Sequence, residues 1–196
     1  MSFKFIKTFI PGLYEIIPEL HFDNRGFFFE SYNQKDFFAA GLTMEFLQDN
    51  QSLSKKNVFR GLHFQKEHPQ GKLIRCLEGK VLDLALDLRN GSETFGRYCS
   101  IILDSQKANM FYIPCGFAHG FYVLSDQTVI SYKCSDFYAP QDQDGVLWNS
   151  KELNIDWEKL CPTIKENAIL SDRDKNYKEF SLKNKYYDLS GKWIGN

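Results

Sequence analysis

Long uninterrupted apolar runs are missing from this chain of 196 residues. Residues 1–17 are broken by Lys4, Lys7 and Pro11, so they lack the apolar stretch of a secretory signal. The most apolar region, residues 110–124, contains a proline, a histidine and two glycines, which suits buried strands joined by turns better than a membrane helix. We therefore expect a soluble, cytoplasmic protein with no membrane partner.

An excess of charge of one sign is also missing. The chain has 24 Lys and Arg against 25 Asp and Glu, a formal net charge of -1. This balance does not supply the positive field that proteins use to neutralise the phosphates of a nucleic-acid backbone. Nucleic acid is therefore not an expected partner.

Cysteine is sparse, and its spacing carries no motif. The five cysteines are an odd number without a Cys-x-x-Cys pair, so neither zinc nor redox chemistry is indicated: Cys76, Cys99, Cys115, Cys134 and Cys161. We expect them to be reduced and mostly buried as small hydrophobic residues. Cys115 differs from the others because it lies in a Pro-Cys-Gly turn.

Aromatic and strand-favouring residues are abundant. Aromatic residues make up 16% and hydrophobic residues 43% of the chain, which indicates a folded, strand-rich protein. In residues 81–88 leucines alternate with Asp83, Ala85 and Asp87, the pattern of a strand with two different faces. Further apolar segments between turn signals predict an antiparallel sandwich or barrel: residues 73–78, 98–103, 110–113, 120–124 and 128–133.

The length and the absence of repeats or linkers indicate one domain, residues 1–196. We expect its core over about residues 20–150, a short helix over 34–40, and a polar C-terminal region, 151–196, wrapped around the barrel. A barrel of this size can hold one ligand among inward-pointing side chains. Polar residues within the strands are therefore the candidates for chemistry.

Two of the four histidines, His63 and His119, lie in apolar, strand-like segments, where an imidazole needs a partner to offset its desolvation. His21 and His68 are expected to be solvated loop residues. Taken alone, His63 is compatible with three roles: structural residue, acid or base, and ligand. Metal-binding barrels of this general shape often carry a His-x-His pair, but the second position here is Gln65, so no metal is expected.

Several cationic residues lie in or beside the apolar segments: Arg25, Arg60, Lys72 and Arg75. If they point inward they form a pocket for a small anion such as a diphosphate, and otherwise they are solvated charges on the barrel rim. Arg60 and His63 are an odd number of positions apart, so an ideal strand places them on opposite faces. Both serve one pocket only where Gly61 marks a bulge or the strand leaves the sheet.

A set of sequence blocks occurs in one order along the chain: DNRGFFFE at 23–30, QDNQSLS at 48–54, RGLHFQ at 60–65, QGKLIR at 70–75, SETFG at 92–96, GFAHGF at 116–121 and YK at 132–133. In these blocks the sequence resembles the dTDP-4-dehydrorhamnose 3,5-epimerase family, from about Lys7 to Asp174. The resemblance implies an all-β, cupin-type double-stranded β-helix jelly roll with a few short peripheral helices. It also implies a homodimer that needs no metal or other cofactor.

The reaction implied is inversion of C3 and C5 of a nucleotide-diphospho-4-keto-6-deoxy sugar, foremost dTDP-4-dehydro-6-deoxy-glucose to dTDP-4-dehydro-L-rhamnose. Hydrogens beside a ketone are acidified because the carbanion delocalises onto oxygen. Inversion therefore needs a base on one face, an acid on the other and positive charge near the oxygen. The resemblance assigns these roles to four residues: His63 as base, Asp174 as the group that orients it, Tyr132 as acid and Lys72 at the oxyanion.

Substrate contacts are implied for ten further residues: Arg25, Glu30, Gln48, Asp49, Asn50, Arg60, His119, Tyr138, Gln143 and Arg173. Among them, Tyr138 is implied to stack on the nucleobase. Glu30 is implied to contact the base or the sugar, from its own or from a partner subunit.

Departures from the family pattern bear on the substrate. Gln143 stands where an acidic residue is common, Arg173 where Lys is usual and Cys115 where Glu is usual. They leave open an epimerase of a GDP-linked 4-keto-heptose that inverts one or both centres. From another class, a non-catalytic sugar-nucleotide-binding cupin also remains, whereas the missing His-x-His pair counts against a metal-dependent cupin enzyme.

Overall fold

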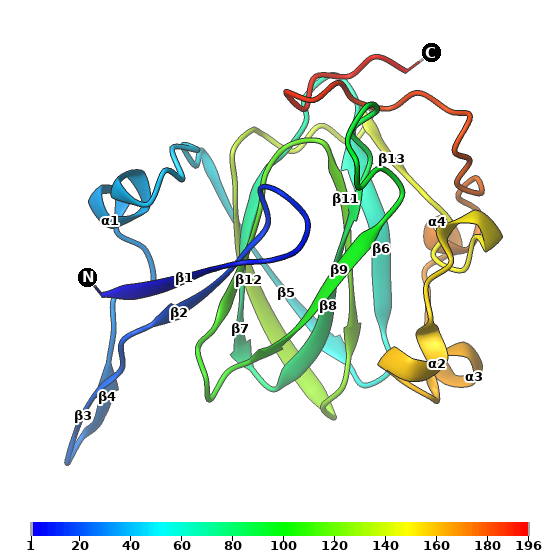
Figure 1. Cartoon of the computed structure of the whole chain (residues 1–196). Helices are drawn as coiled ribbons and strands as arrows, with labels where there is room; N and C mark the ends of the chain where they lie inside the picture. The colour runs from blue at the N-terminus through cyan, green and yellow to red at the C-terminus, as the bar shows by residue number, and fades with distance from the viewer. Residues whose placement is uncertain (1, 196) are drawn as a thin grey trace.

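The computed structural model describes residues 2–195, whose body consists of two antiparallel sheets that face each other (Figure 1). The six-stranded sheet has the order β1 (Phe3–Lys7), β2 (Tyr14–Pro18), β10 (Met110–Ile113), β7 (Lys72–Glu78), β12 (Gln127–Cys134), β5 (Gln48–Lys55). The five-stranded sheet has the order β13 (Gln143–Gly145), β6 (Phe59–Gln65), β11 (Phe117–Val123), β8 (Lys80–Asp87), β9 (Tyr98–Asp104). From β5 to β8 and again from β9 to β13, successive strands alternate between the sheets. This is an all-β jelly roll, which confirms the predicted fold class.

Strand β8 shows how the alternating sequence builds the wall of the barrel. Its leucine face, including Leu84 and Leu86, packs in one apolar cluster with Trp157 and Phe180 of the C-terminal region. Its other face, including Ala85, belongs to the cluster between the two sheets. Both faces of β8 are therefore buried, and the aspartates on its inner face lie inside the barrel.

The C-terminal region adds short helices against the outside of the five-stranded sheet. They are η1 (Lys151–Leu153), α2 (Trp157–Leu160), α3 (Ile164–Asn167) and α4 (Asp172–Lys175). Figure 1 shows them in yellow and orange beside the barrel, with α4 close to β6. This packing places α4, in the C-terminal region, next to β6, the strand that carries His63.

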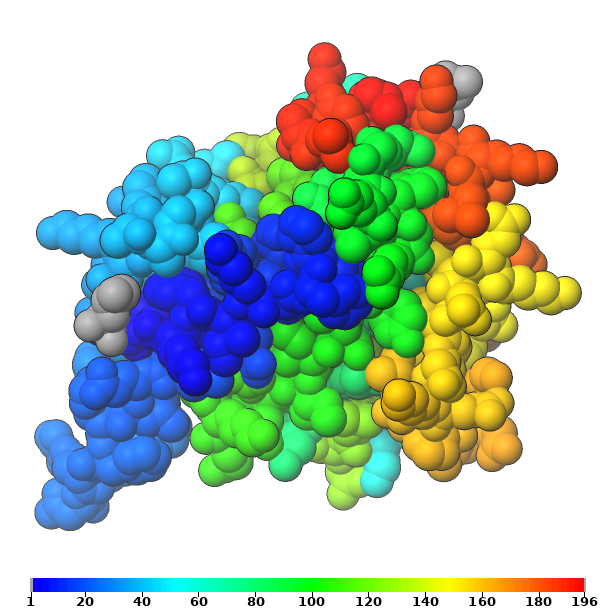
Figure 2. Space-filling view, in the orientation of Figure 1, coloured from blue at the N-terminus to red at the C-terminus, as the bar shows by residue number. Residues whose placement is uncertain are grey.

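A hairpin of β3 (His21–Asp23) and β4 (Gly26–Phe28) projects from the body of the chain, at the lower left in Figure 2. Its aromatic side chains are open to solvent, with Phe22 73% and Phe28 69% exposed. Large apolar side chains on a projecting hairpin are typical of a surface that another molecule covers.

The helix α1 (Gln34–Ala39) follows the hairpin and coincides with the helix predicted from the sequence. Asn33 caps it, because its side-chain oxygen accepts a hydrogen bond from the backbone N–H of Lys35.

None of the helices within residues 2–195 is long and apolar enough to cross a membrane.

Candidate active site

A cavity of about 830 Å³ lies between the two sheets. Strands of both sheets line it, together with parts of the segments that follow β12 and α3. Ten of the residues predicted from the sequence meet there: Asn50, Arg60, His63, Lys72, His119, Tyr132, Tyr138, Gln143, Arg173 and Asp174. The structure therefore gathers residues from distant parts of the chain into one site.

His63, on β6, forms a hydrogen bond with Asp174 of α4. Nε2 of His63 lies 2.5 Å from Oδ1 of Asp174, whose side chain is buried. The hydroxyl of Ser171 accepts a hydrogen bond from the Asp174 N–H at 3.1 Å and so fixes the start of α4. Burial lowers the pKa of His63 below its usual value, although the hydrogen bond to Asp174 opposes this shift. The imidazole is therefore neutral near pH 7 and able to accept a proton.

Gly61 allows His63 and Arg60 to share the cavity. Its φ is +140°, and an added Cβ would lie 2.5 Å from the Cα of Gly120. The pairing of β6 with β11 shifts register at this point, between His119 and Phe121. Because of this bulge, the side chains of Arg60 and His63 both line the cavity, although an ideal strand would place them on opposite faces.

His119 forms a second buried pair, with Asp83 of β8. Its Nε2 lies 2.9 and 3.0 Å from the two carboxylate oxygens, and Asp83 has no exposed surface. In the register of β6 and β11, His119 lies opposite His63. The buried Asp83 carboxylate therefore fixes the orientation of the His119 ring, which is the second imidazole of the site.

Lys72 and Tyr132 occupy the wall opposite His63, because β7 and β12 belong to the six-stranded sheet. Burial lowers the pKa of Lys72, and Lys72 forms no ion pair within residues 2–195. Its amine is thus not paired with a carboxylate of these residues and is available to a ligand in a low-dielectric site. Burial also raises the pKa of Tyr132, so the phenol keeps its proton and can donate it.

Polar contacts among Tyr138, Gln143 and Arg173 cross one side of the cavity. The Tyr138 hydroxyl donates to Oε1 of Gln143 at 2.7 Å, and a guanidinium N–H of Arg173 donates to the same oxygen at 3.0 Å. Because Gln143 is neutral, it accepts both bonds without cancelling the charge of Arg173. A cation and an aromatic ring thus stand together at the cavity.

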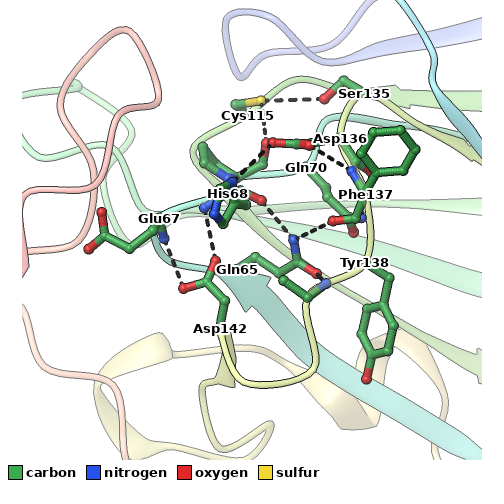
Figure 3. A network of polar contacts seen from close by, with 12 residues as sticks. Gln65, Glu67, His68, Gln70, Cys115, Ser135, Asp136, Phe137, Tyr138 and Asp142 are labelled. Carbon is green, nitrogen blue, oxygen red and sulfur yellow. Dashed lines mark hydrogen bonds and ion pairs between the residues drawn. The ribbon is translucent and has the colours of Figure 1, made fainter.

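The segments 66–71 and 135–142 are bound to each other beside this site (Figure 3). The carboxylate of Asp142 accepts from the backbone N–H groups of Glu67 and His68, at 3.0 and 2.9 Å. The side-chain amide of Gln70 donates to the Asp136 carbonyl at 2.8 Å. Two irregular segments therefore form one connected unit.

The cysteines are free within the described residues. Cys76, Cys99 and Cys134 are buried, as the sequence predicted, whereas Cys115 and Cys161 are partly exposed. The thiol of Cys115 donates to the Pro69 carbonyl at 3.2 Å, and Figure 3 shows it at the edge of the network.

Four predicted substrate residues do not line the cavity of a single chain: Arg25, Glu30, Gln48 and Asp49. Arg25 lies on the projecting hairpin, where its exposed side chain pairs with Asp23 at 2.6 Å. Glu30 accepts hydrogen bonds from Asn33, and Asp49 pairs with Lys133 at 3.0 Å. Gln48 lies behind the cavity lining, with its side chain bonded to Asn50 and to the backbone of Tyr138.

Asp83, Gln65 and Tyr177 support or line the site but were not predicted as site residues. The ring of Tyr177 meets the His63 ring edge-on, with centroids 5.7 Å apart. It fits because Gly145 has no side chain, since a Cβ there would lie 2.5 Å from the Tyr177 ring. Asp83 left a signal in the sequence as a carboxylate on the inner face of an apolar strand, and Gln65 left one as the residue two positions after His63.

No cluster of three or more His, Cys, Asp or Glu residues suited to a metal ion occurs within residues 2–195. The groups that line or support the cavity are able to transfer protons: a buried imidazole with its carboxylate, a protonated phenol on the opposite wall and a buried lysine amine. Fold and site together define a jelly-roll protein equipped for acid and base chemistry on a small anionic ligand.

Comparison with known proteins identifies the family. The family model for dTDP-4-dehydrorhamnose 3,5-epimerase matches residues 7–181, and the chain belongs to this family. It is 46% identical over 177 residues to a dTDP-4-dehydrorhamnose 3,5-epimerase of Shigella flexneri, covering 89% of this chain and 94% of that protein. The corresponding protein of Methanothermobacter thermautotrophicus is 43% identical over 177 residues, covering 90% of this chain and 94% of that protein.

A solved structure shows the same fold. The dTDP-6-deoxy-D-glucose-3,5-epimerase from Legionella pneumophila, in complex with dTDP-4-keto-L-rhamnose, superposes with a TM-score of 0.86. It is 42% identical, and the match covers 93% of this chain and 95% of that one.

Proposed function

We propose that this protein epimerises C3 and C5 of dTDP-4-dehydro-6-deoxy-glucose to give dTDP-4-dehydro-L-rhamnose. The observation that carries the proposal is the placement of His63 and Tyr132 on opposite walls of one cavity. Inversion at carbon requires a proton to leave one face and another to arrive at the other face. Family membership agrees with this chemistry, because the relatives named above are 3,5-epimerases.

His63 removes the proton beside the ketone. Its lowered pKa keeps the imidazole neutral, and Nε2 is held by Asp174, so Nδ1 is the nitrogen that accepts the proton. The carboxylate then stabilises the imidazolium that forms. Asp174 acts through His63 and holds it in one orientation.

Lys72 and Tyr132 complete the step. As the C–H bond breaks, its electron pair delocalises onto the ketone oxygen, and the Lys72 ammonium stabilises that negative charge. Tyr132 donates its phenolic proton to the opposite face of the enolate carbon. The phenolate and the imidazolium return to their resting states by exchange with solvent, and the same cycle serves the second carbon.

Binding of the nucleotide falls to the residues around the cavity. Arg60 and Arg173 place two guanidinium groups where a diphosphate needs them. The Tyr138 ring, 48% exposed, offers a flat surface on which a base stacks.

We also propose a homodimer in which the projecting hairpin completes the partner's site. The hairpin keeps Arg25 out of the cavity lining of its own chain and exposes Phe22 and Phe28. A dimer that covers these rings removes apolar surface from water. Light scattering should then give a mass twice 22.9 kDa, and a monomer that turns over at full rate would contradict the dimer.

The test of the reaction compares two substrates. Purified protein is mixed with the dTDP-linked 4-keto-6-deoxy-glucose or with a GDP-linked 4-keto-heptose, and the products are identified by NMR. Conversion of the first and loss of that conversion in His63→Asn support the proposal. Conversion of the GDP-linked sugar alone would overturn the nucleotide assignment, and binding without any conversion would identify a non-catalytic cupin.

A further inference from the structure

Gln65 stands two residues after His63, at the end of β6. Its side chain lines the cavity although only 4% of the residue is exposed. The Tyr187 hydroxyl donates to its backbone oxygen and anchors it from the C-terminal region. Metal-binding barrels often carry their second histidine at this position. Here the position holds the buried amide of Gln65, and the hydrogen bonds of that amide indicate its role.

The Gln65 amide joins two segments that have no regular structure (Figure 3). Its Nε2 donates to the His68 carbonyl at 2.7 Å and to the Phe137 carbonyl at 3.1 Å. Its Oε1 accepts from the Ala139 N–H at 2.9 Å. Both donor hydrogens and one acceptor site are therefore used, and two of the three bonds go to the residues on either side of Tyr138.

The backbone around Tyr138 depends on these bonds. Residues 137–139 lie beyond the end of β12 and form no strand ladder. The Tyr138 N–H itself donates to Oε1 of Gln48 at 3.0 Å. Two glutamine side chains thus replace the hydrogen bonds that a neighbouring strand would make, so the half-exposed ring stands on a fixed backbone.

We propose that Gln65 is a positioning residue that holds Tyr138 ready to stack on the nucleobase, an inference that rests on the proposed function. Only a neutral amide fits the position, because it must donate to two carbonyls and accept from an N–H at once. A ring that is already in place loses little conformational freedom when the base arrives. Gln65 therefore acts on nucleotide affinity more than on the rate of proton transfer.

The test measures dTDP binding and turnover in Gln65→Met, which keeps the side-chain length and removes the three hydrogen bonds. We expect the Kd for dTDP and the KM to rise about tenfold, the effect of losing roughly one to two net hydrogen bonds, with a much smaller change in kcat. Unchanged affinity in a folded variant would overturn the proposal. A fall in kcat at constant KM would do so as well.

Asp142→Asn is the matched control. Asp142 also joins the two segments, but the bonds of its carboxylate go to Glu67 and His68 and not to the neighbours of Tyr138. Its backbone N–H donates to the Ala139 carbonyl, and the substitution leaves that bond in place. We expect its Kd to stay within about twofold of the wild type, because the residues flanking Tyr138 keep their partners. An equal loss of affinity in both variants would show general loosening of the segments and contradict a specific role for Gln65.

A double-mutant cycle separates action through Tyr138 from any other effect. In a Tyr138→Ala background, Gln65→Met should cause no further loss of dTDP affinity, because the ring it positions is gone. If Gln65→Met lowers dTDP affinity by the same factor with and without the Tyr138 ring, Gln65 does not act through Tyr138 and the proposal is overturned.

One measurement needs no variant and so does not depend on folding. The Ala139 amide should exchange slowly with heavy water in the free protein, because Oε1 of Gln65 holds it. If the Ala139 amide exchanges as fast as an amide in an unfolded chain, Gln65 does not hold this segment in place and the proposal is overturned. If instead the Ala139 amide is protected but the wild-type protein neither binds dTDP nor converts the substrate, the proposed function is wrong. The hydrogen bonds by which Gln65 fixes the backbone around Tyr138 are then still confirmed.

Discussion

Oδ1 of Asp174 lies 2.5 Å from Nε2 of His63, although 111 residues separate the two along the chain. The contact makes the short helix α4, in the C-terminal region, part of the candidate active site. In the proposed mechanism it leaves Nδ1 as the imidazole nitrogen that meets the substrate, since Nε2 is already occupied.

Asp174→Asn should lower kcat by about 10³-fold, with a small effect on KM, because an amide keeps the contact but does not balance the imidazolium. Steady-state kinetics on the dTDP-linked substrate measures the effect. Asp172→Asn is the control, since its side chain is exposed on the same helix and should leave the rate unchanged. A rate within tenfold of wild type for Asp174→Asn would remove Asp174 from the mechanism.

Stability should depend on pH through His63. Burial lowers its pKa in the folded state below the value of about 6.5 that it has in the unfolded chain, so the unfolded state binds more protons near and below that pH. The free energy of unfolding therefore falls as pH decreases from about 6.5, with a slope of at most about 1.4 kcal/mol per pH unit for this group. Urea unfolding between pH 5 and 8 (a range of roughly three units around the histidine pKa) should show a weaker pH dependence in His63→Asn. Identical slopes in the two proteins would contradict a depressed pKa.

Tyr132→Phe should separate proton exchange from inversion. His63 still removes a proton and returns one to the same face, so deuterium still enters the sugar, while inversion falls by about 100-fold for want of the acid. Tyr98→Phe, a tyrosine that does not line the cavity, should change neither rate. If exchange and inversion in Tyr132→Phe fall in parallel, Tyr132 is not the acid of the second face.

Gly61→Ala should destabilise the fold by about 3 kcal/mol or more, because a side chain is strained at this φ and its Cβ meets the Gly120 backbone. Gly91→Ala is the control: φ is also positive, but nothing lies within 4 Å, so about 1 kcal/mol of strain is expected. Thermal unfolding measures both. Equal losses would mean that the close approach of β6 and β11 contributes nothing.

The fold was predictable where one strand carried a full pattern. In residues 81–88 the alternation of leucine with aspartate and alanine gave both the strand and its two faces, and β8 (Lys80–Asp87) has them. The strand β5 (Gln48–Lys55) was not among the strands predicted, because it carries mostly polar residues. Some of these line the cavity and others face solvent, so apolar periodicity could not reveal the strand.

The residues themselves marked four members of the candidate site, His63, His119, Arg60 and Lys72, and the family resemblance supplied the other six of the ten that line the cavity. Charge and spacing alone left His63 with three possible roles. Gln65 and Tyr177 were not predicted as site residues because their contacts join segments far apart in sequence: Gln65 and Ala139, for example, are 74 positions apart. No local pattern records such a contact.

The most direct test of the central claim is proton NMR in heavy water, with the dTDP-linked 4-keto-6-deoxy-glucose generated in place and His63→Asn as control. We expect deuterium at both C3 and C5, formation of the L-sugar, and neither result with the variant. Deuterium at one carbon alone would contradict double inversion. Its absence from both carbons in the presence of folded wild-type protein would contradict the proton-transfer mechanism itself.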